Sequence, residues 1–216
     1  MSDKRAVIFA NGRIPNYERA AGLLLPGDYI IAADGGSLHA LAMQVRPHVV
    51  IGDFDSLPEA EMAHLTMLGT IFWRFPPEKD ETDLELALRY AVEAGYRRIL
   101  ILGALGGRLD QTLGNLALLT SERFAGVEIR LDDGVEAVCL VRGAVEIRGA
   151  PGDTLSLIPW GAPVTGIVTS GLKYPLAGET LYPDQTRGVS NEMLTDTARV
   201  SVESGLLLCI HIRYEV

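Results

Sequence analysis

The sequence predicts a two-part fold: an α/β domain built on a parallel sheet, followed by a smaller all-β domain. Over the first two thirds of the 216 residues, short β-branched runs alternate with amphipathic stretches of helical period. After about Asp133, short alternating segments separated by Gly and Pro replace the helical periods. A chain of this length can bury the cores of two small domains.

Six segments of the first part are expected to be the strands of the parallel sheet. They are Ala6–Ala10, Tyr29–Ala33, Val49–Ile51, Ile71–Phe75, Arg98–Leu102 and Val127–Leu131. Five stretches between them carry apolar residues at three-and-four spacing and are expected to be helices. They are roughly Asn16–Leu25, Ser37–Val45, Pro58–Leu68, Thr82–Ala94 and Leu109–Arg123. A parallel sheet wrapped by helices is a Rossmann-like arrangement.

The second part is expected to be a small sandwich or barrel, because its strand-like segments are short and closely spaced. These segments are Glu136–Val141, Thr154–Pro159, Thr165–Thr169, Ala198–Val202 and Leu206–Ile212. We expect the boundary near Val141–Gly143, which gives an α/β domain over 1–142 and an all-β domain over 143–216.

Composition excludes several classes of protein. A formal charge of −9 disfavours a nonspecific nucleic-acid binder, which usually carries a basic excess. The apolar runs are too short to cross a bilayer, and the first residues do not resemble a signal peptide, so we expect a cytoplasmic protein. Cys139 and Cys209 lie in apolar runs and are expected to be buried thiols. The four histidines lack the spacing of a zinc site.

Two loops that follow predicted strands carry acidic residues where an α/β sheet binds ligands. Asp34-Gly35-Gly36-Ser37 offers backbone amides to a phosphate, with Ser37 expected to cap the next helix, although a plain tight turn explains it equally well. Gly52-Asp53-Phe54-Asp55-Ser56 places two carboxylates at i and i+2, which share a face in an extended segment. Such a pair favours a divalent cation, although two solvated aspartates remain an alternative.

Two further loops supply acids, glycines and cations. Lys79-Asp80-Glu81-Thr82-Asp83 opens a helix, where its acids are well explained as helix-capping groups. Gly103-Ala104-Leu105-Gly106-Gly107-Arg108-Leu109-Asp110-Gln111 is glycine-rich but lacks the Gly-Lys-Ser/Thr ending of a Walker A loop. Arg108 can fork onto phosphate oxygens, and Asp110 can bind metal or orient Arg108. Five aspartates meeting at one sheet edge without a cation would be costly, so the loops together predict phosphoryl-type transfer with Mg²⁺.

In this order, the four acidic and glycine-rich motifs resemble those of thiamine pyrophosphokinases. Gly171-Leu172-Lys173-Tyr174 and Gly188-Val189-Ser190-Asn191-Glu192 look like the thiamine-binding segments of that family, and the likeness spans nearly the whole chain. The resemblance implies a catalytic α/β domain, a C-terminal β-sandwich and a homodimer with active sites at the subunit interface. It also implies that the thiamine hydroxyl attacks the β-phosphorus of ATP and that AMP leaves.

The resemblance carries roles over to individual residues. The catalytic residues it implies are Asp53, Asp55, Asp83, Arg108 and Asp110, of which Asp53, Asp55 and Asp83 match the metal-binding carboxylates. The residues expected around ATP are Asp34, Gly35, Gly36, Lys79, Thr82, Gly106, Gly107, Arg108 and Gln111. Those expected to hold thiamine are Tyr174, Ser190 and Asn191, with Tyr174 stacking on the cationic ring unless it is an ordinary half-buried strand residue.

Two departures from the family pattern concern substrate contacts. Gln111 stands where many relatives carry His, and Val189 stands where Thr is usual. Gln can still donate and accept hydrogen bonds, whereas Val189 loses a hydroxyl group, which bears on substrate affinity.

The proton of the thiamine hydroxyl group could pass to Asp80 or to Asp110. The alternatives are another ATP-dependent kinase for a small alcohol, a binding module without turnover, and a scaffolding protein.

Overall fold

The chain divides into two units. The structure, a computed structural model, describes residues 4–214. Contacts between residues divide the chain into Met1–Gly134 and Val135–Val216. The predicted functional boundary after Arg142 stays a prediction, because a division by contacts does not test a division by function.

The first unit contains a parallel sheet with the strand order β6-β5-β1-β2-β3-β4. Its strands are β1 (Arg5–Phe9), β2 (Tyr29–Ala33), β3 (Val49–Gly52), β4 (Ile71–Arg74), β5 (Arg98–Leu102) and β6 (Glu128–Asp132). The predicted strands are therefore confirmed, with their ends shifted by at most one residue. Most of their residues are buried, which explains why these strands are continuous apolar runs rather than alternating ones.

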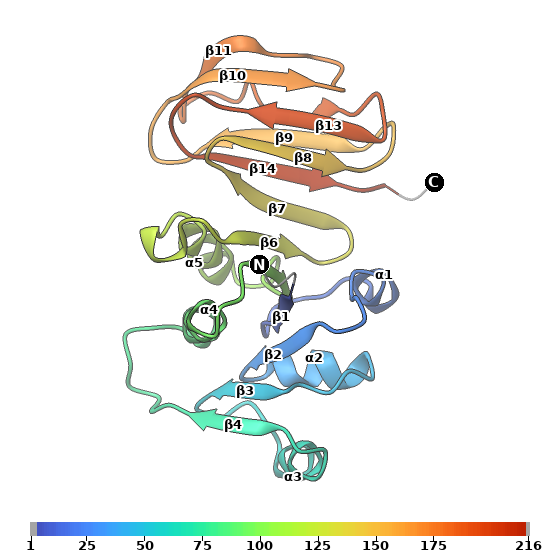
Figure 1. The fold of residues 1–216 in the computed structure, drawn as a ribbon, viewed down its shortest axis with the longest axis vertical. Coiled ribbons are helices and arrows are strands. Elements are labelled where there is room, and N and C mark those ends of the chain that lie inside the picture. The colour runs from blue at the N-terminus through green and yellow to red at the C-terminus, as the bar shows by residue number, and fades with distance from the viewer. Residues whose placement is uncertain (1–3, 215–216) are drawn as a thin grey trace. The chain divides into compact units, whose positions relative to one another are not determined.

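Helices cover both faces of this sheet. They are α1 (Tyr17–Ala21), α2 (Gly36–Ala42), α3 (Glu59–Met67), α4 (Asp83–Glu93) and α5 (Leu109–Leu118). Figure 1 shows α2 on one face, and α4 and α5 on the other. Val7 and Phe9 of β1 share a buried cluster with Ala40 of α2 and Leu65 of α3, so alternate strand residues build each side of the core.

All five helices are shorter than predicted, α1 and α5 by the most. Helix α1 ends at Ala21 because Gly22 is its C-cap and Pro26 follows soon after. Helix α5 ends at Leu118, and a separate 3-10 turn, η1 (Glu122–Phe124), follows it. The Thr120 hydroxyl donates to the Ala117 carbonyl oxygen there, a local bond that competes with a continued helix. Among residues 4–214, no helix is both long and apolar enough to cross a membrane.

The strand order reverses between β1 and β5. The chain runs outward from β1 to β4 and then returns to β5 on the opposite side of β1. The loops after β1 and β5 meet there, and the Gly12 amide donates to the Gly103 carbonyl oxygen at 2.8 Å. A side chain at Gly12 would place its Cβ 2.4 Å from that oxygen, so the approach requires glycine. Parallel sheets bind ligands at such a reversal.

The second unit is built from antiparallel strands in the orders β12-β9-β14-β7 and β11-β10-β13-β8. Their bounds are β7 (Glu136–Val141), β8 (Ala144–Arg148), β9 (Thr154–Pro159), β10 (Val164–Ser170), β11 (Ala177–Leu181), β12 (Asn191–Glu192), β13 (Thr197–Ser201) and β14 (Leu207–Ile212). The predicted strands are present. Strands β8, β11 and β12 were not predicted, because each is short or presents few apolar residues.

The two sets of strands in the second unit share one hydrophobic core. Leu155 of β9 and Leu207 of β14 belong to the same buried cluster as Ile167 of β10 and Val200 of β13. Cys209 is buried in this cluster, as predicted, whereas Cys139 is only partly buried and packs against it. In strands such as β10 and β13 the core residues are interspersed with more exposed ones, which is why this part of the sequence lacks helical periods.

Candidate active site

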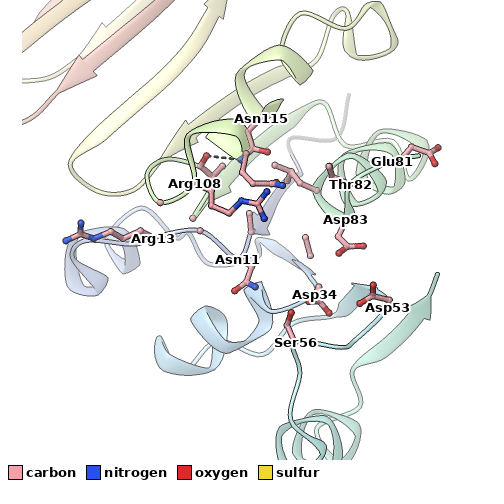
Figure 2. A pocket seen from close by; sticks show the side chains of 18 of the residues that line it. Asn11, Arg13, Asp34, Asp53, Ser56, Glu81, Thr82, Asp83, Arg108 and Asn115 are labelled. Atoms are coloured by element: carbon pink, nitrogen blue, oxygen red, sulfur yellow. Dashed lines mark hydrogen bonds between the residues drawn. The ribbon is translucent and has the colours of Figure 1, made fainter. Parts of the chain in front are cut away.

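A cavity of about 830 Å³ lies in the first unit, at the carboxyl ends of its strands. Its walls come from loops that follow β1, β2, β3 and β5 and from the segment that opens α4 (Figure 2). The lining falls within residues 10–13, 33–34, 53–56, 77–84 and 103–115. The predicted acidic and glycine-rich loops therefore meet at one sheet edge.

Three aspartates in this cavity form a cluster. Each of Asp34, Asp53 and Asp55 offers a carboxylate oxygen, and these oxygens lie within 4.8 Å of one another. Asp34 is buried, and its Oδ1 accepts no hydrogen bond among the described residues. Close negative charges and a buried acceptor without a partner are unfavourable without a cation. Carboxylate oxygens are hard ligands, so the trio fits Mg²⁺ or another divalent cation of that type.

The backbone around Phe54 differs from the extended segment that the sequence predicts. Phe54 has φ 67°, in the left-handed region, and its side chain is only 6% exposed. The Asp55 amide donates to Asp53 Oδ1 at 3.1 Å, and the Ser56 hydroxyl donates to Asp55 Oδ1 at 2.9 Å. The two carboxylates therefore meet through a tight turn around a buried ring, and not through the alternation of a strand.

Close packing joins this turn to Asp34. A Cβ on Gly52 would lie 2.9 Å from the Cβ of Asp34. Asp34 itself has φ 44° and is followed by Gly35 and Gly36, where a Cβ on Gly36 would lie 2.0 Å from the Phe9 carbonyl oxygen. Helix α2 therefore begins at Gly36, and the prediction that Ser37 caps it is wrong. The Ser37 hydroxyl donates instead to the Asp34 carbonyl oxygen at 2.9 Å.

Asp83 lies beside the trio and pairs with a lysine. Its Oδ1 is 3.0 Å from Lys79 Nζ, and Figure 2 shows it close to Asp34 and Asp53. Burial raises the pKa of the Asp83 carboxyl group, the Lys79 ammonium group lowers it, and the charges of Asp34 and Asp53 raise it again, with a net increase. Its role as a metal ligand stays a prediction, whereas Asp34, expected beside the phosphates, is a member of the trio.

The start of α4 is fixed by Thr82. Its side-chain oxygen accepts a hydrogen bond from the Glu85 amide at 3.2 Å, so Thr82 is the N-cap. Asp80 is exposed and lies outside the cavity lining, whereas Glu81 lines the cavity and pairs with Arg89 at 2.8 Å. The prediction that the acids of this motif cap the helix is therefore wrong, because Thr82 is the cap, whereas Asp83 lies in the first turn as an acid that matches the helix dipole.

The glycine-rich loop forms the opposite wall. Gly103, Gly106 and Gly107 all have left-handed φ values, which favours glycine at these positions. Arg108 is the N-cap of α5, and its guanidinium group donates to both carboxylate oxygens of Asp110, at 3.1 and 2.5 Å. The hydrogen bonds from Arg108 hold the pKa of Asp110 below its usual range. Among the predicted roles of Asp110, this geometry favours orienting Arg108.

The cavity gathers most predicted residues and some that were missed. The predicted residues in its lining are Asp34, Asp53, Asp55, Lys79, Thr82, Asp83, Gly106, Gly107, Arg108 and Gln111. Gly35, Gly36 and Asp110 are neighbours outside it. The missed lining residues include Asn11, Arg13 and Asn115. Asn11 and Arg13 follow β1, so the rule applied to the other strands would have found them. Asn115 donates to the Ala104 carbonyl oxygen at 2.9 Å (Figure 2).

In the second unit, the two predicted thiamine-binding segments lie side by side. The Asn191 side-chain amide donates to the Tyr174 carbonyl oxygen at 2.8 Å, and the Tyr174 amide donates to Asn191 Oδ1 at 3.1 Å. The Ser190 amide donates to the Ser156 hydroxyl oxygen at 3.0 Å. Tyr174 is 65% exposed, so its ring is available for stacking and is not a half-buried strand residue. Val189 is also exposed.

Known proteins match both units. A family model described as thiamin pyrophosphokinase, catalytic domain, matches residues 22–131, and one described as thiamin pyrophosphokinase, vitamin B1 binding domain, matches residues 144–207. A thiamine pyrophosphokinase of Bacillus subtilis is 31% identical over 182 residues, which cover 83% of this chain and 85% of that protein.

Solved structures agree with the sequence matches. The crystal structure of a thiamine pyrophosphokinase from Bacillus subtilis has a TM-score of 0.88 and 28% identity, covering 98% of this chain and 100% of that one. The thiamin pyrophosphokinase from Geobacillus thermodenitrificans gives a TM-score of 0.84 at 28% identity, with 98% of each chain covered.

Proposed function

The chain belongs to the thiamine pyrophosphokinase family and is an enzyme of that kind, and from this premise we propose how its residues carry out the reaction. The reaction moves the diphosphate of ATP to the hydroxyl group of thiamine. The thiamine oxygen forms a bond to the β-phosphorus, the bond from that phosphorus to the bridging oxygen of AMP breaks, and the hydroxyl proton is released. The products are thiamine diphosphate and AMP.

The observation that carries this proposal is the aspartate trio, in which the buried Oδ1 of Asp34 accepts no hydrogen bond from residues 4–214. We propose that Asp53 and Asp55, with Asp83 and Asp34 beside them, hold Mg²⁺. The bound ion would neutralise negative charge on the phosphates and on the transferred group. Lys79, whose ammonium group lies 3.0 Å from Asp83, would offset charge that builds on the transferred group.

The chain's other cavity residues would bind and orient ATP. Gly106 and Gly107 line the cavity without side chains, so phosphate oxygens can approach their backbone. Arg108 would donate to the phosphate oxygens in a forked geometry, held in place by Asp110. Because the pKa of Asp110 is lowered, it is a weak proton acceptor, and we assign it to positioning. Gln111 would contribute a neutral donor to the same wall.

Thiamine would bind on the second unit. Its cationic ring is expected to stack on Tyr174, while Ser190 and Asn191 hold the neighbouring backbone in shape.

Two sets of antiparallel strands around one core support a β-sandwich for this unit, and the strand order with its reversal supports a Rossmann-like first unit. As the family resemblance implies, we propose a homodimer with active sites at the subunit interface. Light scattering on the purified protein would test it, and a monomeric mass would contradict it.

A product analysis tests the reaction. The protein is incubated with ATP, Mg²⁺ and thiamine, and the nucleotides and thiamine phosphates are separated and quantified. We expect AMP and thiamine diphosphate in equal amounts, and ADP as the sole product would contradict diphosphate transfer. A panel of other small alcohols tests for a different kinase substrate. Tight binding of ATP and thiamine without AMP would indicate a binding module.

Because ATP is the donor, we also propose a cytoplasmic location, which cell fractionation would test.

A further inference from the structure

Arg74, the last residue of β4, contacts the turn that carries two of the clustered carboxylates. Its Nη1 donates a hydrogen bond to the Asp53 carbonyl oxygen at 3.0 Å. The same guanidinium group lies over the Phe54 ring, with its Cζ 4.8 Å from the ring centroid. Arg74 lies outside the described lining of the cavity, so its contacts reach the site through Asp53 and Phe54.

Phe54 adopts a backbone conformation that needs support. Its φ of 67° lies in a region that aromatic residues rarely occupy. The ring is buried and meets the ring of Phe72 edge-on, with centroids 5.4 Å apart. Such a conformation persists where the surroundings fix it. Here the Phe72 ring and the Arg74 guanidinium group fix the side chain, and the bond from Arg74 to Asp53 fixes the preceding carbonyl group.

The conformation of Phe54 sets the relation between its two neighbours. Asp53 and Asp55 flank it, and the Asp55 amide donates to Asp53 Oδ1 at 3.1 Å. If Phe54 took an ordinary extended conformation, the direction of the chain at Asp55 would change and the carboxylate oxygens would separate from Asp34. The 4.8 Å grouping of the trio therefore depends on the turn that Arg74 supports.

We propose that Arg74 is a positioning residue that acts through Phe54 and the Asp53 carbonyl group to hold the two carboxylates in the geometry that binds the divalent cation. The proposal rests on the proposed metal role of the trio. Arginine suits this position better than lysine, because a planar guanidinium group can stack on a ring and donate a hydrogen bond in its own plane at the same time.

The test measures binding of Mn²⁺ alone to the full-length protein by electron paramagnetic resonance. Outer partners of metal ligands typically change metal affinity by about 10-fold to 100-fold when they are replaced, so Arg74→Gln is expected to weaken Mn²⁺ binding by about tenfold. Arg74→Lys keeps the charge and is also expected to bind Mn²⁺ more weakly than the wild type. If Arg74→Lys binds Mn²⁺ as tightly as the wild type, the charge alone explains the effect of Arg74, and the proposal is overturned.

The matched control is Arg46→Gln. Arg46 also donates from Nη1 to a backbone carbonyl oxygen, that of Leu68, elsewhere in the first unit. This control is expected to bind Mn²⁺ as the wild type does. The activity of Arg74→Gln should need about tenfold more Mg²⁺ for half its maximum, with kcat nearly restored at saturating Mg²⁺. A merely structural role would lower the melting temperature without moving this Mg²⁺ dependence.

A double-mutant cycle tests the route through Phe54. Phe54→Leu keeps an apolar anchor but removes the ring face that Arg74 covers. If Arg74 acts through Phe54, the double variant should lose less Mn²⁺ affinity than the two single losses combined. Fully additive losses would overturn this route.

Asp53→Asn separates this inference from the proposed function. If the wild type binds no Mn²⁺, or if Asp53→Asn binds Mn²⁺ as tightly as the wild type does, the metal site and the role of Arg74 are both refuted. If Asp53→Asn abolishes binding but Arg74→Gln binds as tightly as the wild type, the metal site stands and the positioning role is refuted.

Discussion

The candidate sites of the two units differ in how their polar side chains are hydrogen-bonded. In the cavity of the first unit, three carboxylates converge and Oδ1 of Asp34 accepts no hydrogen bond from the described residues. In the second unit, Asn191 and Tyr174 satisfy each other through two reciprocal hydrogen bonds, and the Tyr174 ring remains exposed. The comparison teaches that the first site leaves a buried acceptor for a ligand to satisfy, whereas the second satisfies its own polar groups and leaves a ring face exposed.

The largest expected effect removes one charge from the first site. Asp55→Asn should lower kcat by about a thousandfold, because an amide cannot replace a carboxylate in binding a cation that stabilises charge in the transition state. The rate of AMP formation at saturating substrates measures the loss, and the melting temperature should stay near that of the wild type. Glu59→Gln, at an exposed acid in the first turn of α3, is the control. If Asp55→Asn forms AMP at the wild-type rate, the Asp55 carboxylate is not needed for catalysis, and the proposed contrast between the two sites is refuted.

A backbone change in the first unit should come next. Gly36→Ala would place a Cβ 2.0 Å from the Phe9 carbonyl oxygen, which forces β1 away from α2. We expect a loss of about 3 kcal/mol in the free energy of unfolding, measured by urea denaturation. Gly114→Ala in α5 is the matched control, because its Cβ would meet nothing within 4 Å and alanine favours helix. Equal stability of the two variants would contradict the close approach.

In the second unit, a buried pair makes stability depend on pH. His211 Nε2 lies 2.7 Å from Asp153 Oδ2, and both residues are buried. Burial raises the pKa of Asp153, but the hydrogen bonds from His211 and from the Ala150 and Tyr214 amides outweigh it, so the pKa is lowered in the folded protein. The contribution to stability is therefore complete above the usual pKa of about 3.9 and is lost as the pH falls through the lowered value.

Asp153→Asn tests this pair. The variant should lose about 2 kcal/mol of stability near neutral pH, because a buried charge-assisted hydrogen bond is weakened. Its stability should also change less than that of the wild type as the pH is lowered to about 2.5. Urea denaturation at a series of pH values gives both quantities. Parallel curves for the two proteins would show that Asp153 does not contribute to the acid sensitivity.

The smallest expected effect belongs to the exposed ring of the second unit. Tyr174→Ala should raise the KM for thiamine by about tenfold with a small change in kcat, because a stacking contact to a cation contributes to binding of substrate and transition state alike. Stability should not change, since the ring is 65% exposed. Tyr182→Ala, at another exposed tyrosine of the same unit, is the control. An unchanged KM in Tyr174→Ala would place thiamine elsewhere.

The sequence predicted the strands of the first unit well, because a parallel strand buried on both faces is a continuous apolar run such as Val49–Gly52. It predicted helix ends less well. The expected α5 extended to Arg123, and local bonds around Thr120 and Ser121 that end the helix have no periodic signal. Strand β12, of two residues, forms only through pairing with β9, so tertiary contact creates it.

The site was predictable in its loops but not in its geometry. The rule that ligands bind at the carboxyl ends of parallel strands found Asp34, Asp53 and Asp55, yet it did not predict which three carboxylates would group together. That grouping depends on the left-handed backbone of Phe54, which is rare for an aromatic residue and therefore unexpected from sequence. Arg74 was missed because its contacts are with a carbonyl group and a ring that belong to another strand end.

The close approach of Gly52 to Asp34 limits which residue can stand at position 52. Because a Cβ at position 52 would lie 2.9 Å from the Asp34 Cβ, a larger residue there would push the aspartate out of place. A substitution at position 52 therefore requires the backbone around Asp34 to move. A residue that bears no functional group at all therefore limits where the Asp34 carboxylate can lie.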